Sequence, residues 1–65
     1  MRLWSFIFPD ASSPVVSARV AAPNLTGATL LLTAEGVDVD GVLTQWMGEV
    51  EGDVGVRQLV RRAAA

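Results

Sequence analysis

The sequence contains no cysteine and no histidine. Without cysteine, disulfide scaffolds, zinc sites of the cysteine type and thiol catalysis are all excluded. Without histidine, the chain lacks the side chain most used for acid–base catalysis and the commonest metal ligand. The chain has 65 residues, and domains typically hold about 50 residues or more. The sequence therefore predicts a single small domain over 1–65, without covalent or metal cross-links to stabilise it.

Long apolar runs are also missing. No stretch approaches the roughly 18 apolar residues that a membrane-spanning helix needs. The apolar stretch 1–8 ends at Pro9 and Asp10, which makes it too short for the core of a signal peptide. We therefore expect a protein that is not secreted, either cytoplasmic or part of a soluble assembly.

Positive charge is scarce and comes from arginine alone. The formal net charge is -2, and the five basic residues include no lysine, a bias typical of GC-rich genomes such as those of many bacteria and phages. Such a chain has no overall positive field, so the composition does not favour nucleic acid as a partner. Six acidic residues and no basic one lie in 35–53, whereas 54–65 holds three arginines and no acid. This asymmetry marks an interaction surface, or else charges that are solvated or pair with each other.

Three stretches of the first half alternate in the way that β-strands do. The first, 2–8, is apolar on both faces, which is typical of a strand covered on two sides. One of its faces carries Trp4, Phe6 and Phe8, and the other carries Leu3 and Ile7. Proline-rich and glycine-rich turns separate this stretch from 15–22 and 28–34. The sequence predicts a three-stranded antiparallel β-meander over about 2–8, 15–22 and 28–34.

The second half has apolar residues at spacings of three and four, which favour helices. Asp40 is placed to cap a helix over about 41–49, although Gly41 and Gly48 each weaken it by about 1 kcal/mol relative to alanine. A second helix is predicted over about 56–63, with arginines in its last turns. Residues 50–55 also fit a strand pattern, so the sequence does not decide whether they form a turn or a strand. The expected fold class is thus α+β, a meander followed by one or two short C-terminal helices.

One motif has a chemical pattern. The run Asp38-Val39-Asp40-Gly41-Val42-Leu43-Thr44 resembles the first motif of the haloacid-dehalogenase-type phosphatases. The resemblance implies Asp38 as a nucleophile, Asp40 as general acid/base, and magnesium between them and the phosphate. That family also needs a downstream lysine and a buried strand directly before the first aspartate, and this chain has no lysine. We therefore expect no enzyme, no catalytic residue, no metal site and no cofactor, with Asp40 acting as a cap.

Hydrophobic residues make up 51% of the chain, more than one small core requires. A core of this size supplies only about 3–5 kcal/mol, and small domains usually add cross-links or partners. The sequence therefore predicts a small non-catalytic structural or assembly subunit that works by protein–protein contact, either as a homo-oligomer or on a larger protein partner. The alternative is a small acidic regulatory binder or inhibitor that uses 35–53 against a basic partner. The candidate interface residues are Leu3, Trp4, Ile7, Trp46, Arg57 and Arg61.

Overall fold

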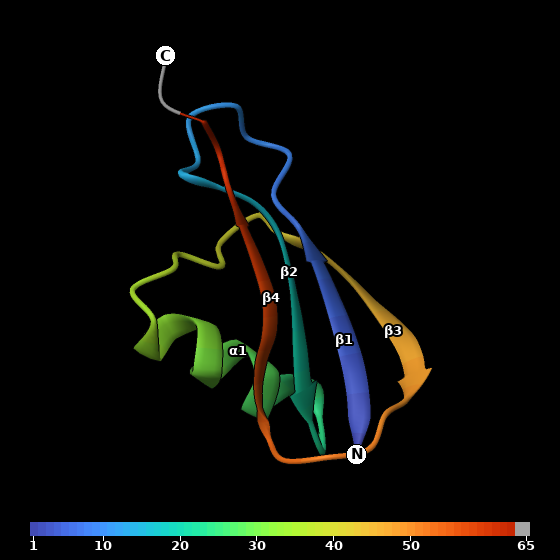
Figure 1. Cartoon of the computed structure of the whole chain (residues 1–65). Helices are drawn as coiled ribbons and strands as arrows, with labels where there is room; N and C mark the ends of the chain where they lie inside the picture. Colours follow the sequence, from blue (N-terminus) through green and yellow to red (C-terminus); the bar gives the residue numbers. More distant parts are fainter. Residues whose placement is uncertain (64–65) are drawn as a thin grey trace.

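A computed structural model describes residues 1–63. Four strands form one sheet in the order β3-β1-β2-β4, and all neighbouring strands are antiparallel. The two central strands are consecutive in the chain, and β3 and β4 form opposite edges (Figure 1). The elements are β1 Arg2–Ile7, β2 Val15–Ala22, α1 Leu25–Ala34, β3 Leu43–Glu49 and β4 Gly55–Arg61. The structure is therefore mostly β, with one short helix.

The central hairpin coincides with the first two predicted strands. β1 and β2 pair from Arg2 opposite Ala22 to Ile7 opposite Ser17. Their connection contains Pro9 and Pro14, and Asp10 organises it by accepting hydrogen bonds from the backbone N–H and the hydroxyl of Ser12, at 2.9 and 2.8 Å. Such Asx turns replace lost strand hydrogen bonds locally. The inward faces of the two strands meet on the same side of the sheet, where Phe6 lies opposite Ala18. The alternation of β2 is broken at its start, because a register shift between Val15 and Ser17 buries Val15 and leaves Val16 exposed.

The third predicted strand, 28–34, is wrong, because these residues belong to α1. The helix begins after Asn24, whose side-chain oxygen accepts a hydrogen bond of 2.8 Å from the backbone N–H of Gly27. This is the N-cap interaction that satisfies a free N–H of the first turn. Thr29 and Thr33 flank three consecutive leucines, and each threonine hydroxyl donates to the carbonyl four residues earlier. Both bonds join residues four apart, as an α-helix requires, so these threonines do not indicate a strand.

Gly36 ends the helix. Its φ of 81° lies in the left-handed region that glycine adopts without steric cost. The N–H of Gly36 donates to the carbonyl of Thr33 at 2.9 Å, and the N–H of Val37 donates to that of Leu32 at 3.1 Å. This pair of bonds is the Schellman arrangement, and it is usually accompanied by an apolar contact between the two outer residues. Leu32 and Val37 are both buried in the core.

The two predicted C-terminal helices, 41–49 and 56–63, are also wrong, because these regions form β3 and β4. Gly41 and Gly48 adopt φ values of 72° and 111°, neither of which fits an α-helix. In β4 the β-branched Val56 and Val60 suit a strand. The segment between the two strands, left open by the sequence, is a connection that reaches from one edge of the sheet to the other.

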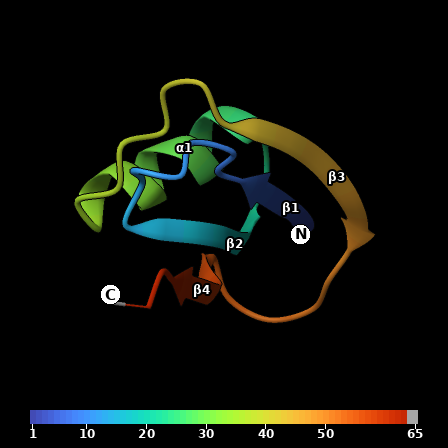
Figure 2. The same ribbon diagram turned by 90° about the horizontal axis from the view of Figure 1, so that it is seen from above.

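This topology replaces the predicted meander. α1 lies against one face of the sheet, chiefly over β2 and β4, as the view from above shows (Figure 2). The opposite face of the sheet carries no helix. The helix therefore covers half of one face, and the rest of the sheet depends on loops or stays exposed.

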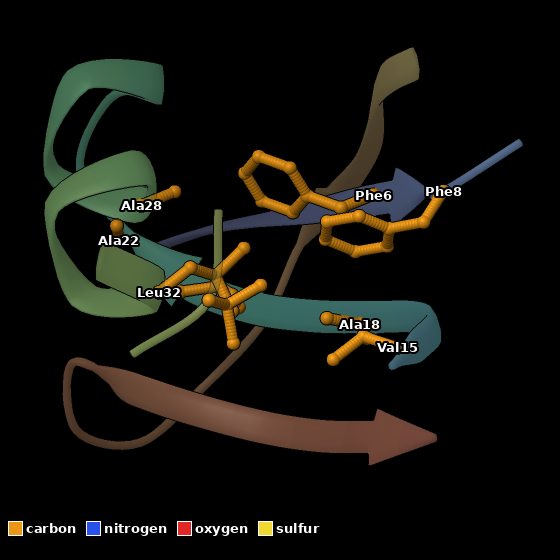
Figure 3. Packing of buried hydrophobic residues seen from close by; sticks show 9 residues of the cluster. Phe6, Phe8, Val15, Ala18, Ala22, Ala28 and Leu32 are labelled. Carbon is orange, nitrogen blue, oxygen red and sulfur yellow. The ribbon is translucent and has the colours of Figure 1, made fainter. Parts of the chain in front are cut away.

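The hydrophobic core lies between α1 and the central hairpin. Its largest fully buried side chains are Phe6, Leu32, Val15 and Val20. Phe6 and Phe8 project from the β1 side toward the residues of β2 and of the helix (Figure 3). Small residues let the helix approach the sheet closely, because Ala18, Ala22 and Ala28 are completely buried. The core is compact but small, and it uses few of the large apolar side chains in the sequence.

The helix predicts unequal effects on stability for two leucines that lie two residues apart. Leu32 is fully buried, whereas Leu30 is 64% exposed. Leu32→Ala should cost about 2–5 kcal/mol, most of the stability that a chain of this size has. Leu30→Ala should stay within about 0.5 kcal/mol of the wild type. Thermal and urea unfolding followed by circular dichroism measures both. Equal losses would contradict the helix, because in a strand Leu30 and Leu32 share one face.

Candidate interaction surface

The face of the sheet opposite α1 is the first part of a candidate interaction surface, and the strand registers order its residues into cross-strand rows. Directly opposed residues in antiparallel strands point to the same face. Phe6 and Val20 are buried on the helix side of the sheet. The residues directly before and after them in sequence therefore point to the face away from the helix. The three rows, each running from β3 to β4, are Leu43-Ile7-Ser17-Val60, Gln45-Ser5-Arg19-Gln58 and Gly48-Leu3-Ala21-Gly55. We call this surface the open face.

The first row of the open face is apolar and exposed. Leu43 is 61% exposed, Ile7 47% and Val60 38%, and only Ser17 interrupts them. With neighbouring strands about 4.8 Å apart, the row extends about 14 Å across all four strands. Leu3, in the third row, is half-buried. The sequence prediction that Leu3 and Ile7 lie opposite Trp4 and Phe6 agrees with these registers.

A second apolar area lies on the other face, beyond the helix. Trp4 and Trp46 are directly opposite each other on β1 and β3. Trp4 packs against the core and its indole N–H donates to the carbonyl of Ala22 at 3.3 Å. Trp46 lies farther from the helix and is 55% exposed. An exposed tryptophan on an edge strand is a costly surface residue, and tryptophan is enriched at interface hot spots.

The two sheet edges differ in charge. In β3 the residues from Leu43 to Gly48 carry no charge and no proline, and nearly all of β3 is exposed. β4 carries Arg57 and Arg61 and contacts α1 along part of its length. Charged side chains and a covering helix are the usual protections of a strand edge. β4 therefore has both, whereas β3 has no covering helix and carries one charge, Glu49, at its end.

Arg57 and Arg61 have different surroundings. The register shift between Arg19 and Val20 leaves Arg57 as the extra residue of a β-bulge in β4. Its guanidinium donates to the carbonyls of Glu51 and Asp53, both at 2.9 Å, and it lies so close to Gly52 that a Cβ there would be 2.7 Å from Nη2. Arg57 thus fixes the connection between β3 and β4. Arg61 is exposed and lies opposite Val15.

The acidic segment does not form one surface. Glu35, Asp38 and Asp40 precede β3, and the other three acids lie at or beyond its far end. β3 has seven residues, so at about 3.3 Å per residue it separates the two groups by roughly 20 Å. Glu49 moreover forms an ion pair of 3.4 Å with the amino group of Met1. The structure therefore divides the acidic charge between the two ends of the sheet.

The aspartate motif lies in the loop between α1 and β3. Its first aspartate follows a helix end rather than a buried parallel strand, and the carboxylate of Asp38 accepts a hydrogen bond of 3.0 Å from the backbone N–H of Asp40. Asp40 precedes a turn and a strand, so its predicted role as a helix cap is wrong. Both aspartates line a cavity of about 370 Å³ between this loop and the β1–β2 connection, together with Asp10 and Val42.

Within residues 1–63, no three Asp or Glu side chains lie close enough together to hold a metal ion. In the same part of the chain no helix has the length and apolar character needed to cross a membrane. No family model, no curated protein and no solved structure matches this chain.

Sequence reasoning missed several members of this surface. Leu43 and Val60 were assigned to helices, so their positions beside Ile7 and Ser17 in one row could not be seen. The run from Leu43 to Met47 shows no regular alternation of apolar and polar residues, so periodicity offered no signal for a strand there. Leu3, Trp4, Ile7 and Trp46 are brought to the β1–β3 side of the sheet, on two different faces.

The loop around Asp10 predicts an acid-dependent loss of stability. Donation from the backbone N–H and the hydroxyl of Ser12, with a smaller effect of Arg62, lowers the pKa of Asp10 below its ordinary value of 3.8. The folded state therefore takes up the proton less readily than the unfolded chain. This contribution to stability is complete above about pH 3.8 and is lost as the pH falls through the lowered pKa.

Asp10→Asn keeps an acceptor oxygen but does not titrate. Its Tm should therefore fall less than the wild-type Tm between neutral pH and about pH 2, as measured by circular dichroism. The matched control is Asp53→Asn, an aspartate in the β3–β4 connection whose side chain accepts no hydrogen bond from residues 1–63. It should follow the wild type. Identical Tm losses for Asp10→Asn and the wild type would contradict the role of Asp10.

Proposed function

We propose that this chain is a small non-catalytic structural or assembly subunit that works by protein–protein contact, with self-association as its first form. The observation that carries the proposal is the number of large apolar side chains left at the surface. Ten hydrophobic residues are buried in the described part of the chain, and ten large ones are at least 36% exposed. Isolated exposed apolar residues are normal, but contiguous ones mark interaction sites.

The exposed apolar residues are concentrated around β3. Leu43, Ile7 and Val60 belong to one row of the open face, and Trp46 lies on the other face of the same edge strand as Leu43. Both areas therefore meet at β3. A chain without cysteine has no disulfide to add stability, and burying these apolar residues against a partner would add it.

The alternative function, an acidic binder acting through 35–53, receives less support. The acids lie in two groups at opposite ends of β3, so a basic partner would meet only three of them at a time. Exposed charges of this kind are screened by salt. The alternative stays a prediction that differs from apolar association in its salt dependence.

Size-exclusion chromatography with light scattering tests the proposal. We expect the average mass to rise above 6.9 kDa as the concentration increases through the micromolar range, and to change little when salt is raised, because apolar contacts are not screened. A chain that stays monomeric throughout would rule out self-association and leave docking on another protein as the only form of the proposal. A mass that falls steeply with salt would instead favour charged contacts.

A further inference from the structure

We infer that the partner is a second copy of this chain, joined through antiparallel pairing of β3 with β3 about a two-fold axis. This inference rests on the proposed function and assigns the surface that it uses. Symmetric dimers require a patch that is complementary to itself. An unpaired strand is such a patch, because its N–H and C=O groups pair with an identical strand running the other way.

Charge selects β3 among the surfaces available. A two-fold seam brings each charged side chain close to its own copy, so like charges near the axis oppose it. Between Leu43 and Gly48 there is no charge to repel. The charges of the seam lie at its ends, where Glu49 of each copy, which already pairs with its own Met1 amino group, approaches the Asp40 turn of the other copy. A seam along β4 would instead bring Arg57 and Arg61 of both copies together, and α1 already contacts that strand.

Stacking of two open faces is disfavoured for a different reason. Arg19 lies in the middle of the open face, between Ser5 and Gln58. The three rows of that face contain no aspartate or glutamate. Face-to-face packing would therefore bury an arginine from each copy with no carboxylate to pair with, which costs several kcal/mol. Pairing at the β3 edge leaves Arg19 in water.

The faces of the sheet restrict the position of the axis. A two-fold axis perpendicular to the sheet keeps each face on its own side, so residues of like face oppose each other across the seam. The register shift between Leu3 and Trp4 makes Met47 an extra residue of β3, so the strand alternates regularly only up to Trp46. The axis therefore passes beside Thr44, Gln45 or Trp46. With the axis at Gln45, Thr44 of one copy opposes Trp46 of the second copy. All three positions cover Trp46 with side chains of the second copy and extend the sheet to eight strands.

The size of the seam sets the expected affinity. Seven residues at about 3.3 Å each give a seam about 23 Å long. Such an edge contact is smaller than the 1,200–2,000 Å² or so that stable complexes bury. We therefore expect a dissociation constant in the micromolar range rather than the nanomolar range.

A matched pair of variants tests the inference, because Gln45 and Gln58 occupy the two ends of the same row. Both are exposed, both point to the open face, and both lie on edge strands. Gln45→Lys puts two positive charges close to the axis and should weaken the dimer at least about tenfold. Gln58→Lys should leave the dissociation constant unchanged. Sedimentation equilibrium measures both, and circular dichroism verifies that each variant is folded.

The outcomes separate this inference from the proposed function. If the wild type associates but Gln58→Lys weakens it as much as Gln45→Lys, or neither does, the chain self-associates through another surface and the β3 seam is wrong. If the wild type remains monomeric up to high micromolar concentration, the inference is overturned together with self-association. A weaker dimer for Gln45→Lys, with an unchanged dissociation constant for Gln58→Lys, supports the β3 seam.

The absence of cysteine allows a second, independent readout. A residue beside a two-fold axis faces its own copy, so a single introduced cysteine there forms a disulfide between the copies when the Cα atoms are about 4.4–6.8 Å apart. Thr44→Cys, Gln45→Cys and Trp46→Cys are compared with Gln58→Cys under mild oxidation, and the covalent dimer is quantified on a denaturing gel. We expect one of the three β3 positions to give several times more dimer than Gln58→Cys. Equal yields at all four positions would overturn the seam.

Discussion

The packing of α1 onto the central hairpin is the contact on which the other elements depend. Phe6 from β1 and Leu32 from the helix are completely buried, and the small residues Ala18 and Ala28 bring the two elements close together. Once this contact forms, the side of the sheet that the helix covers is decided. The edge strands β3 and β4 then pair with a hairpin that already has one buried face. The open face is the other face of the sheet, which the single helix does not cover.

A single helix has too little surface for a four-stranded sheet. α1 has 10 residues, or about 15 Å of length, and it contacts chiefly β2 and β4. The β3 side of the sheet is therefore left with its apolar residues at the surface on both faces. The uneven placement of the helix explains why Trp4 is packed against the core while Trp46, directly opposite, is more than half exposed. The placement of the helix also explains why the β4 edge is partly covered while the β3 edge is exposed.

The sequence predicted the central hairpin and the division of β1 into two faces, because alternation over six to eight residues is a strong signal. It did not predict the helix, because 28–34 was interpreted as a strand although three consecutive leucines stand between Thr29 and Thr33. The decisive signals there were the cap at Asn24 and the terminating Gly36, which act through backbone hydrogen bonds. In the second half, Gly41 and Gly48 argued against a helix, but apolar spacing outweighed them. The surface residues Leu43 and Val60 could not be joined to Ile7 without the strand order, which depends on contacts between distant parts of the chain.

The connection between β3 and β4 links the two outermost strands of the sheet, and this has a kinetic consequence. β1, β2 and α1 are contiguous and end by residue 34, so their contacts close short loops. The pairing of Arg2 with Glu49 and of Val15 with Arg61 closes loops of more than 40 residues, which are slower to form. The chain should therefore assemble from its middle strands outward, with both edges arriving last and together. Before then both sides of the hairpin present open strand edges, which are available for wrong pairing until β3 and β4 are in place.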